Sequence, residues 1–264
     1  MKIKMIALDL DDTLLDEQIK ITSRCENAVK KAASMGIQVI LATGRNYICT
    51  KQYLRQLELA APVITNGGAE VYDERGELIR SRYLTAEMAK EIIGFAVAEG
   101  VHFQIYRDDC FCYEKEDEYC ALYSSFNGLK GMEIPDLRNR SHDTPKLLII
   151  DREEKILELR KKAEKTFGSK YNISISKPWY LEFNRPDASK GAALRYLAEM
   201  YGLERENIMA VGDGQIDLSM IEYAGLGIAM ANGWDTILER ADFITASNQE
   251  DGVAKAIEKF VIGS

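Results

Sequence analysis

The chain has 264 residues, 46% of them hydrophobic and 29% charged, which is typical of a soluble globular protein with room for two domains. Its net charge of -8 disfavours nucleic acid and anionic membrane surfaces as general partners. An anionic substrate would therefore have to be held locally, by a metal ion and a few basic side chains.

Cysteine and histidine usage narrows the chemistry further. The five cysteines are odd in number and form no CxxC pair, which is typical of reduced thiols in the cytoplasm. His102 and His142 are far apart in sequence, which argues against a histidine-ligated zinc site and against a Ser-His-Asp triad. The N-terminus lacks signal-peptide features, and no apolar run reaches the length of a membrane span. We therefore expect a cytoplasmic protein.

Residues 1–81 alternate between predicted strands and helices. The strands are expected at 3–10, 37–43 and 61–66, the helices at 22–36 and 46–59, and a hairpin at 69–81. Apolar strands separated by helices indicate a parallel sheet covered on both faces.

The middle of the chain, residues 82–185, has a different pattern. Two helical segments occur among short strands rich in aromatic and β-branched residues, which indicates an α+β domain inserted into an α/β core. The helices are expected at 85–100 and 152–168, and the strands at 101–108, 110–115, 145–151, 171–176 and 179–184. Residues 186–264 then return to the alternating pattern of the first part.

Candidate chemical residues follow three of the predicted core strands. Asp9 and Asp11 end the first strand, Thr43, Gly44 and Arg45 the second, and Asp213 and Asp217 a strand in the last part. In open α/β sheets, ligands bind outside the carboxyl ends of the strands, which parallel pairing brings to one edge. Lys190, at the start of a predicted helix, faces an unfavourable helix dipole unless an anion such as phosphate bridges the two.

Each of these features also has a purely structural interpretation. Acidic residues are common in turns, Thr-Gly is a common strand exit, Lys190 fits a solvated surface, and Asp217 fits a helix cap. Together they supply a nucleophilic carboxylate, a second carboxylate, a hydroxyl and an amine, the groups that phosphoryl transfer through an aspartyl-phosphate requires. Ligands that are all oxygen favour Mg²⁺.

These residues resemble the motifs of the haloacid dehalogenase (HAD) superfamily, and within it the Cof-type phosphatases with a large C2-type cap. The matching segments are DLDDT at 9–13, TGR at 43–45, Lys190 and GDGQID at 212–217. The resemblance covers the whole chain and implies a Rossmann-like parallel-sheet core with an inserted α+β cap domain. The implied division is a core at 1–81 and 186–264 and a cap at 82–185.

The resemblance also implies a role for each residue in Mg-dependent hydrolysis of small phosphate monoesters, such as sugar phosphates or phosphorylated cofactors. Asp9 would be the nucleophile and Asp11 the general acid and base. Thr43, Gly44, Arg45 and Lys190 would bind the phosphoryl group or substrate. Mg²⁺ would be held by Asp9, the Asp11 carbonyl and Asp213, with support from Asp217. Thr13 would order the nucleophile loop, and Asp12 would be a turn residue.

The substrate-contacting residues of the cap stay open at this point. The candidates are four aromatic residues, Tyr106, Phe111, Tyr113 and Tyr180. For any single one of them, packing in the core of the cap is a better explanation than contact with a substrate. Asn184 and Arg185, near the return to the core, could also reach a substrate.

Two rival functions remain. A receiver-like phosphate switch has similar chemistry but about half the length and no inserted domain. A non-catalytic phosphosugar-binding or regulatory protein could use the same fold. This second alternative rests on Ile216, which stands where the family pattern usually has Asn.

Overall fold

The computed structural model describes residues 2–107 and 110–263, and its chain divides into two compact units. Met1–Arg80 and Ser189–Ser264 form one unit, here called the core unit, and Ser81–Ala188 form the other, the cap unit. The domain limits proposed from the sequence, 82–185, lie inside the range of the cap unit.

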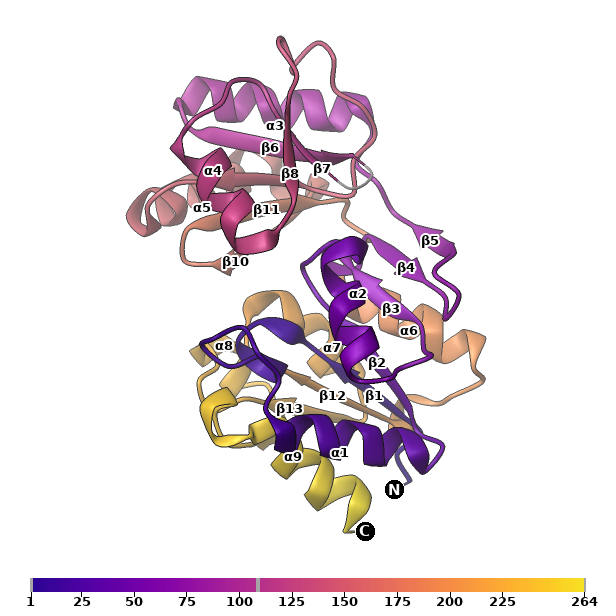
Figure 1. Ribbon diagram of the computed structural model, residues 1–264. Helices are drawn as coiled ribbons and strands as arrows, with labels where there is room; N and C mark the ends of the chain where they lie inside the picture. The colour runs from indigo at the N-terminus through magenta and orange to yellow at the C-terminus, as the bar shows by residue number, and fades with distance from the viewer. Residues whose placement is uncertain (1, 108–109, 264) are drawn as a thin grey trace. The chain divides into compact units, whose positions relative to one another are not determined.

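The strands of the core unit form one sheet, in the order β14-β13-β12-β1-β2-β3-β4-β5 (Figure 1). Pairing is parallel from β14 to β3 and antiparallel between β3 and β4. The strands are β1 (Met5–Leu8), β2 (Gln38–Ala42), β3 (Val63–Thr65), β4 (Glu70–Tyr72), β5 (Leu78–Ser81), β12 (Ile208–Gly212), β13 (Leu226–Ala229) and β14 (Phe243–Ile244). In the centre, β1 pairs with both β12 and β2, so the carboxyl ends of these three strands are neighbours.

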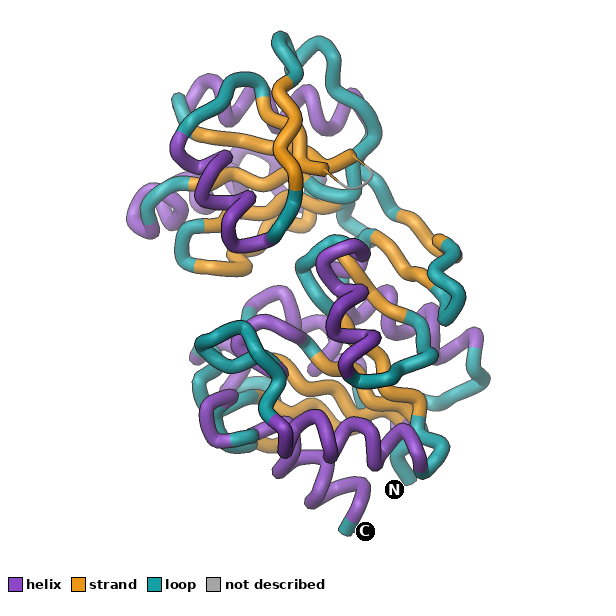
Figure 2. Tube along the Cα trace, viewed as in Figure 1, coloured by secondary structure: helices purple, strands orange, loops and turns teal. Residues whose placement is uncertain are grey.

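Helices cover both faces of the core sheet, as Figure 2 shows. They are α1 (Ser23–Ser34), α2 (Tyr47–Gln56), α6 (Lys190–Met200), α7 (Leu218–Tyr223), α8 (Asp235–Leu238) and α9 (Gly252–Ile257). Side chains of β1 alternate between the faces: Ile6 packs with α1 and α9, and Ala7 packs with α6 and α7. Burial on both faces explains the continuous apolar run of β1 and confirms the predicted α/β core.

The cap unit is an α+β structure with its own sheet, in the order β10-β11-β9-β6-β7-β8. Its strands are β6 (His102–Arg107), β7 (Cys110–Tyr113), β8 (Lys130–Glu133), β9 (Leu147–Ile150), β10 (Asn172–Lys177) and β11 (Tyr180–Asn184). Its helices are α3 (Ala86–Glu99), α4 (Glu118–Asn127) and α5 (Glu153–Phe167). The strand predicted at 101–108 corresponds to β6, and its last residue, Asp108, lies outside the described residues.

One helix and one strand of the cap unit, α4 and β8, were not predicted from the sequence. Among the α4 side chains that the structure describes, Cys120 and Tyr123 are buried, which gives a weak apolar periodicity. Its ends do carry signals: Asp117 accepts hydrogen bonds from the first backbone N–H groups, and Gly128 stops the helix in a left-handed conformation. None of the helices in the described ranges has the length and apolar character that a bilayer crossing requires.

A close backbone approach fixes where α6 begins. Gly68, in the loop after β3, has a φ of 98°, and a Cβ on it would overlap the carbonyl oxygen of Ser189. Ser189 is the N-cap of α6, with its hydroxyl accepting from the N–H of Ala192. The loop after β3 thus sets the position of the residue that follows Ser189, which is Lys190.

Replacing Gly68 with alanine is expected to lower the free energy of unfolding more than replacing Gly36. Both glycines have positive φ, 98° and 80°, so each alanine carries a left-handed strain of roughly 1–2 kcal/mol. Only at Gly68 does the new methyl group meet backbone, because the space at Gly36 is open, and overpacking adds about 1–3 kcal/mol. Urea denaturation measures the difference, and equal losses would contradict the close approach.

Candidate active site

Three buried carboxylates meet at the carboxyl ends of the central strands. Asp9 directly follows β1, Asp213 directly follows β12, and Asp217 ends the short helical turn (Gln215–Asp217) before α7. Carboxylate oxygens of all three lie within 4.8 Å of one another. The parallel pairing of β1 with β12 produces this convergence, since it aligns Leu8, immediately before Asp9, with Val211, two residues before Asp213.

Lys190 provides the positive charge among these acids. Its Nζ donates to Oδ1 of Asp9 and to Oδ1 of Asp217, at 2.5 Å in each case. Burial disfavours the ammonium charge, but Asp217 and Asp9 outweigh burial and raise the pKa of Lys190 above its usual value. The side chain of Lys190 is 0% exposed, which rules out the alternative of a solvated surface lysine.

Asp217 organises the acidic loop. Its Oδ2 accepts hydrogen bonds from the backbone N–H groups of Asp213 and Gly214, at 3.1 and 3.0 Å. Gly212 makes room for this arrangement, because a Cβ on it would lie 2.5 Å from the Cβ of Asp217. Both oxygens of Asp217 therefore have protein donors, so its geometry is that of a supporting residue.

The charges of this cluster do not balance. Burial and the nearby Asp217 raise the pKa of Asp9 to about 7, although Lys190 acts in the opposite direction. Burial and the other two carboxylates also raise the pKa of Asp213 well above its usual value, against the hydrogen bond that Thr13 Oγ1 donates to it at 2.7 Å. When all three carboxylates are ionised, one ammonium leaves a net negative charge, and oxygen ligands of this kind suit a hard divalent cation such as Mg²⁺.

Arg45 and Asp11 form a bidentate ion pair that the sequence analysis did not anticipate. Arg45 Nε donates to Asp11 Oδ2 at 2.8 Å, and Arg45 Nη2 donates to Asp11 Oδ1 at 2.6 Å. Burial opposes the guanidinium charge, but Asp11 outweighs it and raises the pKa of Arg45. In this structure Arg45 thus positions Asp11, and its contact with a substrate stays a prediction.

The Thr-Gly segment and Ile216 lie together beside the acidic loop. The N–H of Thr43 donates to the carbonyl of Ile64 in β3, and Thr43 Oγ1 accepts from the N–H of Arg45 at 3.1 Å. The Cδ1 atom of Ile216 lies 3.3 Å from the position that a Cβ on Gly44 would take. Ile216 therefore places an apolar side chain against the TGR segment.

This geometry agrees with comparisons to known proteins. The model of one protein family, described as haloacid dehalogenase-like hydrolase, matches residues 6–257. The chain belongs to the haloacid dehalogenase-like hydrolases. The family predicted from the motifs is thereby confirmed.

Relatives and solved structures of this HAD hydrolase support the same assignment. The chain is 32% identical to a 5-amino-6-(5-phospho-D-ribitylamino)uracil phosphatase of Bacillus subtilis (strain 168), over 98% of this chain and 96% of that protein. A haloacid dehalogenase-like hydrolase from Bacteroides thetaiotaomicron matches with a TM-score of 0.85 and 29% identity, over 98% of this chain and 99% of the other. A Thermotoga maritima structure gives a TM-score of 0.82 at 31% identity, over 97% of each chain. The predicted enzyme class, a HAD-type phosphatase, is confirmed by these matches.

The aromatic candidates in the cap unit of this HAD phosphatase pack mainly with each other. Tyr106, Phe111 and Tyr113 are buried, and Tyr180 is half-buried. Tyr123 of α4 contacts several of them: its Oη lies 2.6 Å from that of Tyr106, and its ring centroid lies 4.9 Å from that of Phe111. Packing in the cap unit accounts for these side chains without a ligand.

The two candidates near the return to the core have protein partners. Asn184 is buried, and its Nδ2 donates to the carbonyl of Pro145 at 3.0 Å. Arg185 is exposed, and its Nε lies 2.9 Å from Oδ1 of Asp187.

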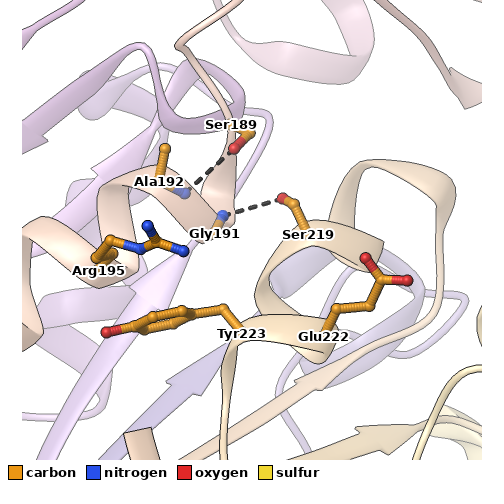
Figure 3. Close-up of a pocket in the computed structure, with 7 residues that line it drawn as sticks. All are labelled: Ser189, Gly191, Ala192, Arg195, Ser219, Glu222 and Tyr223. Carbon is orange, nitrogen blue, oxygen red and sulfur yellow. Dashed lines mark hydrogen bonds between the residues drawn. The ribbon is translucent and has the colours of Figure 1, made fainter. Parts of the chain in front are cut away.

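A pocket of about 420 Å³ lies between α6 and α7 on the core unit (Figure 3). Its lining consists of Ser189, Gly191, Ala192, Arg195, Ser219, Glu222 and Tyr223, and includes none of the clustered acids. The close-up shows the N–H of Gly191 bonded to the Ser219 hydroxyl, at 3.0 Å. A Cβ on Gly191 would overlap the carbonyl of Ser219, so this glycine lets α6 and α7 approach and brings Lys190 to Asp217.

The unbalanced charge predicts how metal-free stability depends on pH. The pKa of Asp9, about 7 in the folded protein, lies above its ordinary value of 3.8. Stabilisation from its proton is therefore fully present below about pH 4 and is lost as pH rises through about 7. We expect the Tm without divalent cations to fall across this window. At pH 8, a hundredfold excess of Mg²⁺ over its Kd should stabilise the protein by about 2.7 kcal/mol and raise the Tm accordingly. The same Mg²⁺ concentration should raise the Tm less at pH 5.

Asp213→Asn tests the same charge balance. Because it removes a buried negative charge, this variant should melt higher than the parent at pH 8 without Mg²⁺ and should gain little on Mg²⁺ addition. Glu17→Gln, which removes an exposed charge, is the matched control and should behave as the parent. A Tm that rises with pH in the metal-free parent would contradict the account.

Proposed function

We propose that this phosphatase hydrolyses small phosphate monoesters through an aspartyl-phosphate on Asp9, with Mg²⁺ as cofactor. The observation that carries the proposal is the buried Lys190, whose ammonium bridges Asp9 and Asp217 beside Asp213. This arrangement supplies a fixed nucleophile, a fixed cation next to it and spare negative charge for a metal.

Asp9 is the proposed nucleophile. Its carboxylate attacks the substrate phosphorus, an aspartyl-phosphate bond forms, and the bond from phosphorus to the leaving oxygen breaks. Water then attacks the same phosphorus and breaks the bond to Asp9, which restores the carboxylate and releases inorganic phosphate. Lys190 donates hydrogen bonds to the phosphoryl oxygens as charge develops on them, with Thr43 and the Gly44 N–H as further donors.

Asp11 is the proposed general acid and base. It gives a proton to the leaving alcohol in the first step and takes one from the attacking water in the second. Its bidentate pairing with Arg45 supports a positioning role for Arg45, since the guanidinium holds both carboxylate oxygens. Proton transfer requires that one of these oxygens become available to the substrate.

The proposed metal ligands are Asp9, the backbone carbonyl of Asp11 and Asp213, with Asp217 in support. When bound, Mg²⁺ neutralises the carboxylates and draws charge from the phosphoryl oxygens. Thr13 holds Asp213 by a hydrogen bond at 2.7 Å and so keeps one ligand oriented.

For the substrate class we infer small phosphorylated metabolites. Support comes from the relative of Bacillus subtilis named above, a phosphatase of a phosphorylated ribitylamino-pyrimidine, and from an HMP-PP phosphatase of Cronobacter sakazakii, 27% identical over 88% of this chain. A panel of phosphate esters, with p-nitrophenyl phosphate as the general probe, tests this class directly. No turnover of any ester with Mg²⁺ present would sink the enzymatic proposal in favour of a binding protein.

Asp9→Asn should lower turnover of p-nitrophenyl phosphate by several orders of magnitude, because an amide cannot form the acyl phosphate. Asp12→Asn is the matched control on the same loop. Asp12 has a φ of 60°, which asparagine tolerates, and its backbone carbonyl already accepts a hydrogen bond from Asn232. We expect the control to retain most activity; equal losses in both variants would argue against Asp9 as nucleophile.

Ile216→Asn should raise turnover. The side chain lies against Gly44 in the proposed phosphate site, where an amide can donate a hydrogen bond that isoleucine cannot. A neutral hydrogen bond of about 0.5–1.5 kcal/mol corresponds to a gain of roughly 2- to 13-fold in kcat. Ile216→Leu, which changes shape without adding a donor, is the control. An asparagine variant that folds fully but turns over no faster than the leucine variant would refute the prediction.

A further inference from the structure

A second set of metal-type ligands lies inside the cap unit. His102 begins β6, Asp117 is the N-cap of α4, and Cys120 lies in the first turn of that helix. One ring nitrogen of His102, one carboxylate oxygen of Asp117 and the sulfur of Cys120 lie within 4.8 Å of one another. The two histidines of the chain are far apart in sequence, which argued against a zinc site with two histidine ligands. This cluster contains only His102, and its other ligands are Asp117 and Cys120.

Gln104 fixes the orientation of His102. The Nε2 of Gln104 donates to the hydroxyl of Tyr106 at 2.9 Å, which leaves its Oε1 facing Nε2 of His102 at 3.3 Å. A carbonyl oxygen only accepts, so in this arrangement the hydrogen of a neutral imidazole is on Nε2 and Nδ1 carries a lone pair. Metal-binding histidines are commonly held in this way by a partner of the second nitrogen.

Nδ1 of His102 faces a second acceptor. Oδ2 of Asp117 lies 2.7 Å from Nδ1. The other oxygen, Oδ1, is held by the backbone N–H groups of Tyr119 and Cys120, at 3.0 and 3.2 Å. Two acceptors at this separation repel each other unless a proton or a metal ion lies between them.

Cys120 distinguishes a metal ion from a proton. With a shared proton between the histidine and the aspartate, the Cys120 thiol only hydrogen-bonds to Asp117, whereas a metal ion would use the sulfur as a third ligand. Cys120 is buried, with 3% of the residue exposed. Cation binding would favour the thiolate form.

We propose that His102, Asp117 and Cys120 form a binding site for a Zn²⁺-type cation, with water as the fourth ligand. Nitrogen, carboxylate and sulfur ligands suit Zn²⁺, whereas Mg²⁺ prefers oxygen alone. Bond lengths of about 2.0–2.3 Å put the ligand atoms of a tetrahedral site roughly 3.3–3.6 Å apart. The three side chains lie within 4.8 Å of one another, and the 2.7 Å between Nδ1 of His102 and Oδ2 of Asp117 would have to widen when the ion binds. The side chain of Asp117 is 40% exposed and offers a route for the ion from solvent.

Such an ion would fasten the start of α4 to the start of β6. Helix α4 carries Tyr123, whose ring packs against Tyr106, Phe111 and Tyr180 of the cap sheet. The proposed ion is thus structural: it would hold this helix against the sheet. The site is independent of the proposed phosphatase mechanism.

Titration of the full-length protein with Co²⁺ tests the site. A cobalt–thiolate charge-transfer absorption is expected at one equivalent per chain, and Zn²⁺ should displace it. The band should be absent from Cys120→Ser and present in the control variant Cys110→Ser. In the parent protein the sulfur of Cys110 contacts the carbonyl of Arg107 at 3.1 Å instead. The core carboxylates offer only oxygen, so Co²⁺ bound there gives no such band.

Absence of the band in the parent protein, or its survival in Cys120→Ser, would overturn the proposal. If Cys120→Ser fails to fold, Asp117→Asn gives a second test, because asparagine still caps α4 but lacks the anionic ligand. This variant should bind Co²⁺ at least about tenfold more weakly. Unchanged affinity would assign the His102–Asp117 pair to a shared proton.

Discussion

The buried ammonium of Lys190 between Asp9 and Asp217 is the interaction on which the core site depends. Without it, three buried carboxylates would lie together with no positive charge between them to offset their repulsion. With it, Asp9 has a fixed partner, Asp217 organises the loop, and Asp213 is left to bind a cation. The Lys190 contacts, at 2.5 Å to each carboxylate, are therefore both structural and functional.

Three glycines, which have no side chain, make this contact possible. Gly191 lets α6 approach the backbone of α7, Gly212 leaves room for Asp217, and Gly68 lets the loop after β3 reach the cap of α6. Each of these positions excludes a Cβ for a steric reason. The site is thus held by backbone packing from several elements rather than by any one loop, which keeps the charged groups in place while they repel.

The sequence was informative where one physical rule dominates. Buried parallel strands require continuous apolar runs, so the core strands and the convergence of Asp9 with Asp213 could be predicted from the order of elements. The sequence could not predict which of several available partners a side chain contacts. Nothing in the sequence near Arg45 indicates that its guanidinium pairs with Asp11 rather than with a substrate. In the cap, α4 lacks an apolar stripe, and the meeting of His102 with Cys120 depends on where that helix packs.

The central claim is that the core carboxylates keep protons which a divalent cation must displace. Calorimetric titration of Mg²⁺ at pH 6, repeated in buffers with different ionisation enthalpies, counts the protons released on binding. Because the pKa of Asp9 is about 7 and that of Asp213 is also raised, the account predicts net proton release at pH 6 that falls as pH rises to 9. Mg²⁺ binding with no proton release at pH 6 would contradict it.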